Sequence, residues 1–600
     1  MIIHRLKQSI KFINLLKLIR REHFTNRKLY IIPNKNLFHL DMMKNENEKI
    51  STETTKKEQI VPEVNFAFVK DESDPLKDKY GVLPFIQSQV NPEIRFTNGW
   101  NKIEDLNAEL EGKEVKLRAR LQRSRIKGKG GFLVVREAFS TLQCCLFVAD
   151  NLVSEQMIKF VGLIPFESLV DIVGVVKKTA KPVESCTQQH IELDVRTIHL
   201  VVPAQNILPF QMEDAIRKVN PVDEEETVAV VSQVEVKPTE ETPADGKDKK
   251  KNKKEKKEKK QEEKKEDKKQ IVVKIDTRLN NRVLDLRVPA TQAIMRLQSA
   301  VGQLFREYLY KNEFVEIHTP KLIAGASEGG TNVFKLKYFD QDACLAQSPQ
   351  LYKQMAVIGD MERVFEIGPV FRAENSNTPR HLCEFTGLDI EMAFKDHYFE
   401  VLDLIGECFY YIFEGLNQRF SKELNVFNNQ YPFEPIKYSK NALKLSFSEG
   451  VELLKSHGIT QDLYEDLDTE NEKMLGKIVK EKYDTDFYIL YRYPKNARPF
   501  YTMPDPEDEN FTNSYDAFIR GEEVLSGAQR VHTYDLLLNK VLDKKINPET
   551  LKDYINSFKL GAPAHAGCGI GLERVVKLFC GMGNIKKCVM FPRDPKRLTP

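Results

Sequence analysis

The stretch between positions 118 and 132 brings six cationic side chains close to one aromatic ring. The cations are Arg118, Arg120, Arg123, Arg125, Lys127 and Lys129, and the ring belongs to Phe132. Cations neutralise phosphates, and an aromatic face lets a nucleobase stack. The pattern indicates nucleic-acid binding, although an ordinary solvated strand face also carries many charges. The residues alone leave both interpretations open.

Several well-known catalytic patterns are missing from the sequence. It contains no GxxxxGK[ST] phosphate loop, and no strand-anchored GxGxxG followed by an acid about 20 residues later. It has no HExxH and no CxxC, and His381 with Glu384 is too sparse a pair for a zinc site. We therefore expect no structural metal. Any metal ion should arrive with the phosphates of a substrate.

Three widely separated segments carry a more specific signal. They are the helix and strand ending at Pro320, the stretch GPVFRAENSNTPRHLCEFTGLDIE at 368–391, and GIGLERVV at 569–576. These segments resemble motifs 1, 2 and 3 of the class II aminoacyl-tRNA synthetases. Further segments resemble the aspartyl members of archaeal and eukaryotic-cytosolic type: SEGG (327–330), QSPQLYKQ (347–354), YDTDFYIL (483–490), RPFYTMPDP (498–506), GEEVLSGAQR (521–530) and the ending FPRDPKRLTP.

The resemblance implies ATP-dependent attachment of L-aspartate to tRNA-Asp, the reaction of an aspartate–tRNA ligase. Aspartate would first form an aspartyl-adenylate with release of pyrophosphate, and the tRNA 3′ end would then take the aspartyl group. Because the substrate carboxylate is itself the nucleophile, the enzyme needs to supply positioning and charge neutralisation. The implied catalytic residues are Arg372, Arg574 and Glu523.

The resemblance also implies an ATP site. Arg372 would grip the α-phosphate and the reacting carboxylate, Arg574 would hold the γ-phosphate, and Phe385 would stack on adenine. The other implied ATP-binding residues are Glu374, Arg380, His381, Leu382, Glu523 and Gly571. Glu523 with Ser526 would hold the Mg²⁺ that accompanies ATP, since a hard cation selects oxygen ligands.

Selection of aspartate over asparagine has to rest on charge, because the two side chains are nearly isosteric. The resemblance places Arg530 and Lys353 around the side-chain carboxylate. The remaining implied aspartate-binding residues are Ser327, Glu328, Gln350, Arg372, Asp389 and Ser526. A buried cation that faces a neutral amide costs ~2 to 5 kcal/mol, which is enough for discrimination.

Two groups of residues are implied for tRNA. Phe132 matches a ring that stacks on an anticodon base, and Arg125, Gln143 and Glu192 match base-reading residues. Stacking combined with edge hydrogen bonds is how single-stranded loop bases are read. In the motif 2 loop, Ser376 and Thr378 are the candidates for contact with the acceptor end.

Two positions depart from the pattern of the resembled family. Pro379 stands where histidine is common, which stiffens the motif 2 loop. Cys568 stands where glycine is usual, and we expect its thiol to be a site for oxidation or alkylation.

Period-two alternation predicts the elements that would position the tRNA residues. In VKLRARLQR, Val115, Leu117, Ala119 and Leu121 alternate with polar residues, as in a half-buried strand. Strand-like runs follow at 132–135, 142–148, 168–176 and 191–202, with a helical stretch, SEQMIKFVG, between the third and fourth strands. Five strands with one helix in this place predict an all-β OB-fold barrel.

From position 275 onward we expect a large α+β domain. Its first helix carries an apolar stripe that includes Ile294, Leu297, Val301 and Phe305. Strands linked by hairpins and loops favour an antiparallel sheet over a doubly wound one. Motif 1 builds a two-fold interface in the resembled family, so we expect a homodimer, although the stripe could equally belong to the core.

The 600 residues carry Lys+Arg 91 and Asp+Glu 88, a net charge of only +3. The first 21 residues contribute +6 and the stretch 247–269 contributes +7, so the rest of the chain is net acidic. The expected domains are a basic N-terminal extension (1–42), a polar arm (43–94), the OB-fold anticodon-binding domain (95–205), a hinge with a Lys-rich insertion (206–274) and the class II catalytic domain (275–600). The Lys-rich insertion is either a tether that attracts nucleic acid or an inert insertion.

Location and partners follow from the same composition. Nine cysteines without a CxxC argue for a reducing, intracellular compartment, and no apolar run approaches the ~18 residues that span a bilayer. We expect a cytoplasmic protein without membrane contact, with organelle import as the alternative if residues 1–42 are a transit peptide. These residues could instead be a tail or precede a start at Met42 or Met43. The N-terminal arm could also contact other proteins, for example in a multi-synthetase assembly.

Two alternative functions are less consistent with the sequence. An asparaginyl enzyme of the same subclass is disfavoured by Lys353 and Arg530. A non-catalytic relative on a retired synthetase scaffold is disfavoured because Arg372, Glu523 and Arg574 are all present.

Overall fold

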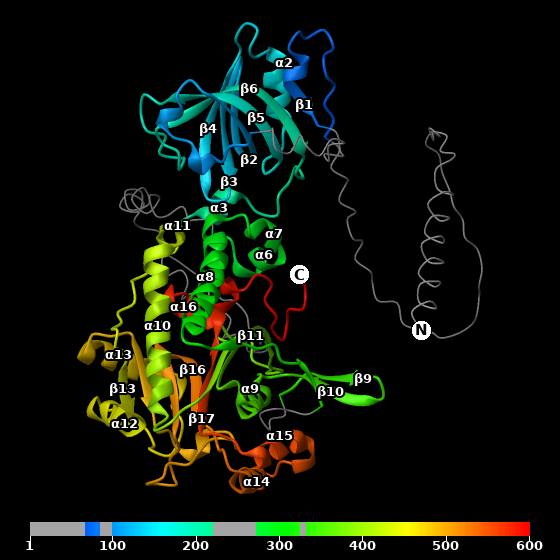
Figure 1. The fold of residues 1–600 in the computed structure, drawn as a ribbon. Helices are drawn as coiled ribbons and strands as arrows, with labels where there is room; N and C mark the ends of the chain where they lie inside the picture. The colour runs from blue at the N-terminus through cyan, green and yellow to red at the C-terminus, as the bar shows by residue number, and fades with distance from the viewer. Residues whose placement is uncertain (1–65, 84–98, 220–271, 325–331) are drawn as a thin grey trace, which may run out of the picture. The chain divides into compact units, whose positions relative to one another are not determined.

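The computed structural model of the chain describes residues 66–83, 99–219, 272–324 and 332–600 (Figure 1). The basic block 1–42, the Lys-rich stretch 247–269 and the SEGG segment lie outside these residues. Expectations about them therefore stay predictions.

Strong alternation of buried and exposed side chains begins at Glu114, where the first long strand starts. The strands are β2 (Glu114–Lys127), β3 (Gly130–Glu137), β4 (Ser140–Phe147), β5 (Leu169–Lys178) and β6 (Ile191–Val202). Their order is β6-β4-β3-β2-β5, and β5 also pairs with β6, which closes the sheet into a barrel. Helix α2 (Glu155–Leu163) lies between β4 and β5 in the chain. The predicted OB-fold barrel is confirmed.

Part of the expected polar arm packs on this barrel. Strand β1 (Tyr80–Val82) pairs in parallel with β6. The rings of Phe66, Phe68 and Tyr80 surround Phe160 of α2, with ring centroids 5.9, 4.9 and 5.7 Å away. These rings bury apolar surface against α2, so residues 66–83 of the expected polar arm pack on the barrel.

The catalytic domain is built on a sheet of eight strands. They are β7 (Val315–Glu316), β11 (Arg363–Phe371), β12 (Glu384–Ala393), β13 (Leu443–Ser446), β14 (Phe487–Tyr491), β15 (Ser514–Ile519), β16 (Glu522–Gln529) and β17 (His565–Gly571), in the order β13-β14-β15-β16-β17-β12-β11-β7. All pairings are antiparallel except β13 with β14 and β7 with β11. This confirms the predicted antiparallel sheet. The first predicted strand is short, because the chain leaves the sheet before Pro320.

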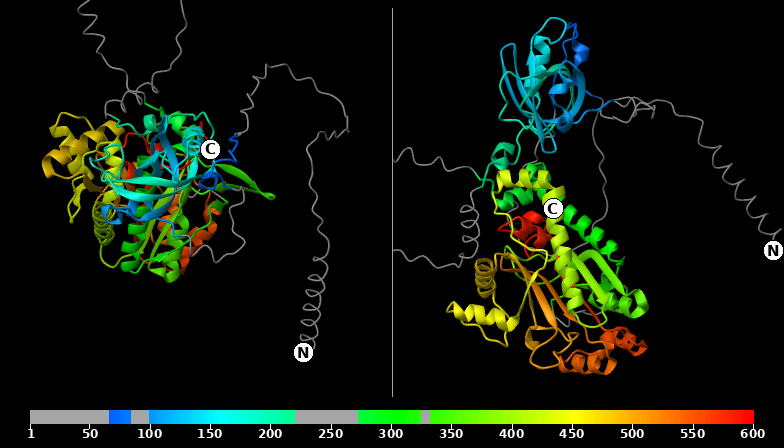
Figure 2. Two further views of the ribbon diagram at one scale, coloured as in Figure 1. Left: turned by 90° about the horizontal axis from the view of Figure 1, so that it is seen from above. Right: turned by 60° about the vertical axis from the view of Figure 1, so that its left-hand side comes forward.

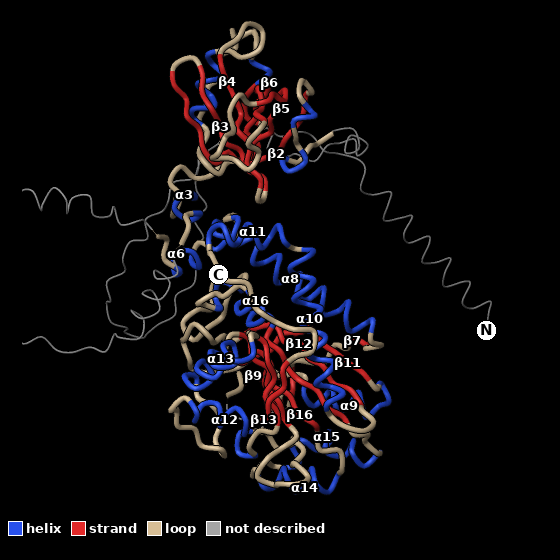
Figure 3. The backbone as a smooth tube through the Cα atoms, turned by 90° about the vertical axis from the view of Figure 1, so that its left-hand side faces the viewer, coloured by secondary structure: helices blue, strands red, loops and turns tan. Residues whose placement is uncertain are grey.

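Helices enclose the strands of this sheet (Figure 3). Helices α8 (Pro289–Lys311), α10 (Phe399–Arg419) and α16 (Leu572–Phe579) share one large apolar core with its central strands. The stripe of α8, including Ile294, Leu297 and Phe305, is buried in that core. The core therefore accounts for the stripe, which gives no separate support to the homodimer.

Further helices and a small sheet belong to the described residues. The helices are α3 (Met212–Ile216), α6 (Ile275–Asn280), α7 (Arg282–Asp285), α9 (Gln350–Ala356), α11 (Ser421–Gln430), α12 (Phe447–Ser456), α13 (Thr469–Tyr483), α14 (Tyr534–Asp543) and α15 (Lys552–Ser557). A small sheet joins β8 (Leu322–Ile323), β9 (Lys335–Tyr338) and β10 (Gln341–Leu345), and its β9–β10 hairpin extends outward from the domain (Figures 1 and 2). Among the described residues, no helix combines the length and apolar character needed to cross a membrane.

Candidate active site

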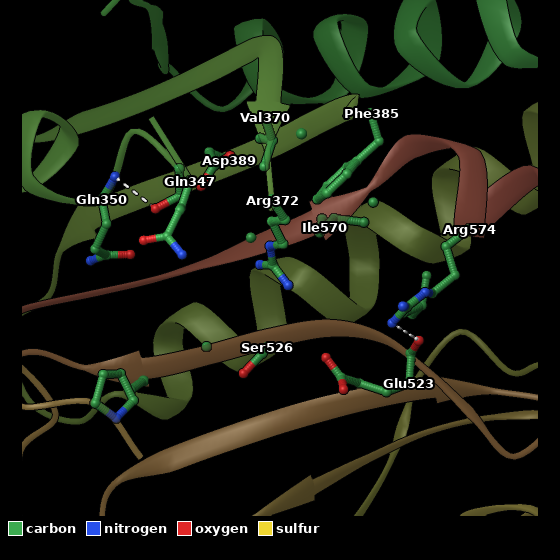
Figure 4. A pocket seen from close by; sticks show the side chains of 18 of the residues that line it. Gln347, Gln350, Val370, Arg372, Phe385, Asp389, Glu523, Ser526, Ile570 and Arg574 are labelled. Atoms are coloured by element: carbon green, nitrogen blue, oxygen red, sulfur yellow. Dashed lines mark hydrogen bonds between the residues drawn. The ribbon is translucent and has the colours of Figure 1, made fainter. Parts of the chain in front are cut away.

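A cavity of about 420 Å³ lies on the catalytic sheet, bounded by β11, β12, β16 and β17 (Figure 4). Its floor is open because glycines alternate along β17, where Gly569 and Gly571 line the cavity. At the neighbouring Gly567, an added Cβ would lie 2.1 Å from the carbonyl oxygen of Ile390. The strands can approach this closely only with glycine at that position.

The cavity brings together most of the residues implied by the motifs. From the ATP set it is lined by Arg372, Glu374, Arg380, His381, Leu382, Phe385, Glu523, Gly571 and Arg574, and from the aspartate set by Gln350, Asp389, Ser526 and Arg530. Lys353 does not line it, and Ser327 and Glu328 lie outside the described residues. Ser376 and Thr378 do not line it either, but their hydroxyl oxygens lie 3.3 and 2.6 Å from Nδ1 of His381, which does.

Two arginines extend into the cavity, one from the end of a strand and the other from a helix (Figure 4). Arg372 follows β11, and its guanidinium lies 5.5 Å from the ring centre of Phe385 on β12. Arg574, in the first turn of α16, donates from Nη1 to the carbonyl oxygen of Glu523 at 3.0 Å. Burial lowers the pKa of His381, which favours the neutral form of its imidazole. This part of the cavity can receive a polyphosphate beside an aromatic ring.

Buried cations occupy the opposite end. Arg530 donates to Glu391, and the Nζ of Lys353 donates to Asp389 Oδ1 at 2.9 Å and to the carbonyl oxygen of Cys568 at 2.9 Å. Burial alone would raise the pKa of Glu391, but Arg530 and Lys353 hold it below its ordinary value. The pKa of Asp389 is raised, because burial outweighs the attraction of Lys353. Lys353 thus lies beneath Asp389 and supports the cavity floor.

Glu523 lines the phosphate end of the cavity, and the buried Asp516 lies near it. Burial, followed by repulsion from Asp516, raises the pKa of Glu523 to about 7. Arg498 grips Asp516 through two hydrogen bonds of 2.9 and 2.7 Å and donates to Ser526 Oγ at 2.9 Å. The Glu523 carboxylate and the Ser526 hydroxyl, which both line the cavity, offer the oxygen ligands that a hard divalent cation selects. No group of three or more His, Cys, Asp or Glu residues in the described parts of the chain could hold a metal, so the cation would need oxygen ligands from a substrate.

Sequence reasoning missed Arg498, Asp516 and Glu391. Asp516 lies opposite Ser526 in the register of β15 and β16, and Glu391 lies opposite Gly567 in the register of β12 and β17. The segment RPFYTMPDP begins at Arg498, so the sequence did contain a signal for that residue.

The barrel places its candidate residues on one outer face. Arg125 is the register partner of Phe132, and Gln143 lies on the next strand, where its side-chain amide donates to Glu192 at 3.1 Å. The ring of Phe132 is 43% exposed and meets Phe147, itself 49% exposed, edge to face at 5.4 Å. The barrel therefore presents two neighbouring exposed rings with polar side chains beside them.

The two unusual positions differ in their surroundings. Cys568 is fully buried in the catalytic core, and burial raises the pKa of its thiol to about 12. The expectation of a reactive thiol at Cys568 is therefore wrong, because the group is neither accessible nor ionised. At Pro379, the carbonyl oxygen accepts a hydrogen bond of 2.9 Å from the backbone N–H of Ile585, which anchors the motif 2 loop.

The same architecture is found in a known family. Residues 274–595 match the family described as tRNA synthetases class II (D, K and N). This match covers more than half of the chain, and the chain belongs to this family of class II tRNA synthetases.

Individual relatives narrow the assignment. The cytoplasmic aspartate–tRNA ligases of Rattus norvegicus and Homo sapiens are each 47% identical over 527 residues, which is 88% of this chain and 96% of each relative. The solved aspartyl tRNA synthetase from Entamoeba histolytica has a TM-score of 0.73 at 43% identity and covers 87% of this chain and 96% of its own. The solved asparaginyl-tRNA synthetase from Pyrococcus horikoshii has a TM-score of 0.65 at 28% identity. That match covers 83% of this chain and 98% of its own. The chain therefore stands among the aspartate–tRNA ligases, as its motifs predicted.

Proposed function

We propose that the cavity is where L-aspartate is joined to ATP and where the aspartyl group then passes to the 3′ end of tRNA-Asp. The observation that supports this most directly is the convergence of Arg372, Arg574 and Glu523 in one cavity whose other end holds Arg530. Its volume of about 420 Å³ lies in the range of pockets that bind small molecules.

In the first step, a carboxylate oxygen of aspartate bonds to the α-phosphorus, and the bond from that phosphorus to the β-bridging oxygen breaks. Arg372 neutralises charge on the α-phosphate and orients the carboxylate, since a planar guanidinium can bridge two oxygens. Arg574 and Arg380 stabilise the charge that develops on pyrophosphate. In the second step, a terminal hydroxyl of tRNA attacks the aspartyl carbonyl carbon, and AMP leaves.

Glu523 and Ser526, with Asp516 beside them, are the residues that would hold Mg²⁺. When bound, the ion would neutralise phosphate charge and help to hold the polyphosphate in place. The raised pKa of Glu523, caused by burial and then by repulsion from Asp516, supports this role, because a bound cation would stabilise the ionised carboxylate.

Selection of aspartate is assigned to Arg530 and, less directly, to Lys353. Arg530 reaches the cavity with its orientation set by Glu391. Lys353 acts from beneath Asp389, which would receive the α-amino group. A neutral asparagine amide would not offer Arg530 the charge-assisted hydrogen bonds that the aspartate carboxylate provides.

The barrel is assigned to the anticodon loop, with Phe132 as the stacking ring and Arg125, Gln143 and Glu192 as base readers. Ser376 and Thr378 would meet the acceptor end. A homodimer, a cytoplasmic location and protein contacts through the N-terminal arm complete the proposal; the location follows the names of the relatives.

Pyrophosphate exchange measured separately with aspartate and with asparagine tests which amino acid the protein activates. We expect exchange with aspartate, whereas exchange with asparagine alone would overturn the assignment. Charging of purified tRNA-Asp and tRNA-Asn then tests which tRNA receives the amino acid. Absence of all amino-acid-dependent exchange would support a non-catalytic scaffold instead.

A further inference from the structure

Helix α13 approaches the cavity without lining it. Glu472 in its first turns accepts a hydrogen bond of 3.0 Å from Arg380 Nη2, and Thr469, three residues earlier, accepts one of 2.9 Å from Nη1. On the other side, Arg380 Nε lies 3.4 Å from Glu522 Oε2. Arg380 itself lines the cavity. Its guanidinium is therefore held by three side chains, two of which come from a helix with no residue in the cavity wall.

The placement of Arg380 is not what the helix alone would favour. A cation beside the first turn of a helix meets the positive end of the helix dipole, which is unfavourable. Glu472 offsets this unfavourable interaction of Arg380 with the helix dipole, because its side chain is only 13% exposed and pairs directly with the guanidinium. The second carboxylate oxygen of Glu522 is bound by Lys577, so charges alternate along Glu472, Arg380, Glu522 and Lys577.

The distance of α13 from the sheet is fixed by two glycines. A Cβ at Gly476 of α13 would lie 2.3 Å from the Cα of Gly521, which joins β15 to β16. Gly521 also has a φ of +71°, a conformation that glycine adopts most readily. The helix thus packs directly on the turn that precedes Glu522 and Glu523, so Glu472 stands at a set distance from the phosphate end of the cavity.

We propose that Glu472 and Thr469 are positioning residues for ATP, which hold the Arg380 guanidinium against the terminal phosphates. A guanidinium has five N–H donors, and the two hydrogen bonds to Thr469 and Glu472 occupy two of them, so others can serve a phosphate. Without Glu472, the nearest anchoring charge for Arg380 is Glu522, and the guanidinium turns toward it. This inference rests on the proposed function, because it assumes that the cavity receives ATP.

The test uses the full chain in aspartate-dependent pyrophosphate exchange. For Glu472→Gln we expect the KM for ATP to rise roughly 10-fold or more, the effect of weakening a hydrogen bond to a charged group, while the KM for aspartate changes less than twofold. Thr469→Val removes one neutral acceptor at an exposed position and should give a smaller change in the same direction. Glu470→Gln alters an exposed acid in the same turn of α13 and should change neither constant.

A double variant separates positioning from a general structural effect. If Glu472 acts through Arg380, adding Glu472→Gln to Arg380→Gln leaves the KM for ATP within twofold of the Arg380→Gln value. Additive effects, or a KM for ATP that is unchanged or lowered in Glu472→Gln, would overturn the proposal. Failure of the unaltered chain to exchange with aspartate would overturn the proposed function instead. Thermal unfolding of each variant confirms that the comparison is made on folded protein.

Discussion

Arg530 donates to both carboxylate oxygens of Glu391, at 3.0 and 3.1 Å, and neither side chain is more than 4% exposed. The pair joins β12 to the end of β16 inside the candidate active site. Burying two charges is costly unless each stays paired. The orientation of Arg530 toward the substrate therefore depends on a residue that does not line the cavity.

Replacement of Glu391 tests this dependence. Glu391→Gln leaves Arg530 with a neutral partner, so we expect the KM for aspartate to rise at least 10-fold and the free energy of unfolding to fall by about 3 kcal/mol. The KM for ATP should change little. Glu384→Gln, an exposed acid on the same strand, is the control. An unchanged KM for aspartate would contradict the role of the pair.

Because the pKa of Glu523 is raised, ATP binding with Mg²⁺ and folding stability should depend on pH in opposite directions. Its pKa of about 7 means that lowering the pH from 8 to 6 protonates the carboxylate in the free enzyme. Metal binding requires the ionised form, so the KM for ATP at limiting Mg²⁺ should rise by up to about 10-fold per pH unit below 7. KM measured across this range checks the trend, and a flat profile would exclude Glu523 as a ligand.

The stability effect has the reverse sign. The folded-state pKa of Glu523 lies above its ordinary 4.5, so its contribution favours folding below pH 4.5 and is lost as the pH rises to 7. Glu523→Gln should therefore stabilise the chain without Mg²⁺ at pH 8, by something on the order of 3 kcal/mol, while exchange activity disappears. A lower unfolding temperature for this variant would contradict the assignment.

Replacement of Phe132 should weaken tRNA binding without affecting adenylate formation. Loss of one stacked base costs about 1 to 3 kcal/mol, so Phe132→Ala should raise the KM for tRNA between roughly 5-fold and 150-fold. Pyrophosphate exchange, which needs no tRNA, should be unchanged. Phe339→Ala removes a still more exposed ring, 86% exposed, from the β9–β10 hairpin and should leave tRNA charging intact. Equal effects of the two variants would argue against specific stacking.

Thiol labelling tests the environment of Cys568. Of the nine cysteines, only Cys383 is partly exposed. Burial raises the pKa of both the Cys383 and Cys568 thiols, so labelling should be slow and should begin at Cys383. Mass spectrometry of native protein after brief alkylation checks the order. Early modification of Cys568 would show that the core opens there.

The alternation along β2 was enough to predict a barrel strand, because a strand with one buried face must repeat every two residues. The partner of Arg530 could not be predicted in this way, since Glu391 reaches it through a pairing of strands distant in the chain. The packing of Phe66, Phe68 and Tyr80 on the barrel could not be predicted from their segment, because its composition is mainly polar and charged. Local patterns thus identified the elements, whereas ion pairs between elements required the fold.

The Lys-rich stretch 247–269, which lies outside the described residues, gives one more prediction. Its charge of +7 would attract tRNA over a Debye length of ~8 to 10 Å. Deleting it should raise the KM for tRNA at low salt and leave pyrophosphate exchange unchanged. Unaltered tRNA kinetics would mean that the insertion is inert.

The packing of residues 66–83 on the barrel determines how the RNA-binding part can be studied alone. A fragment that starts at residue 99 would lose β1 and uncover the ring of Phe160, which Phe66, Phe68 and Tyr80 cover in the chain. Such a fragment would expose a new apolar surface and tend to aggregate. An isolated barrel intended for titration with anticodon stem-loops has to begin before Phe66.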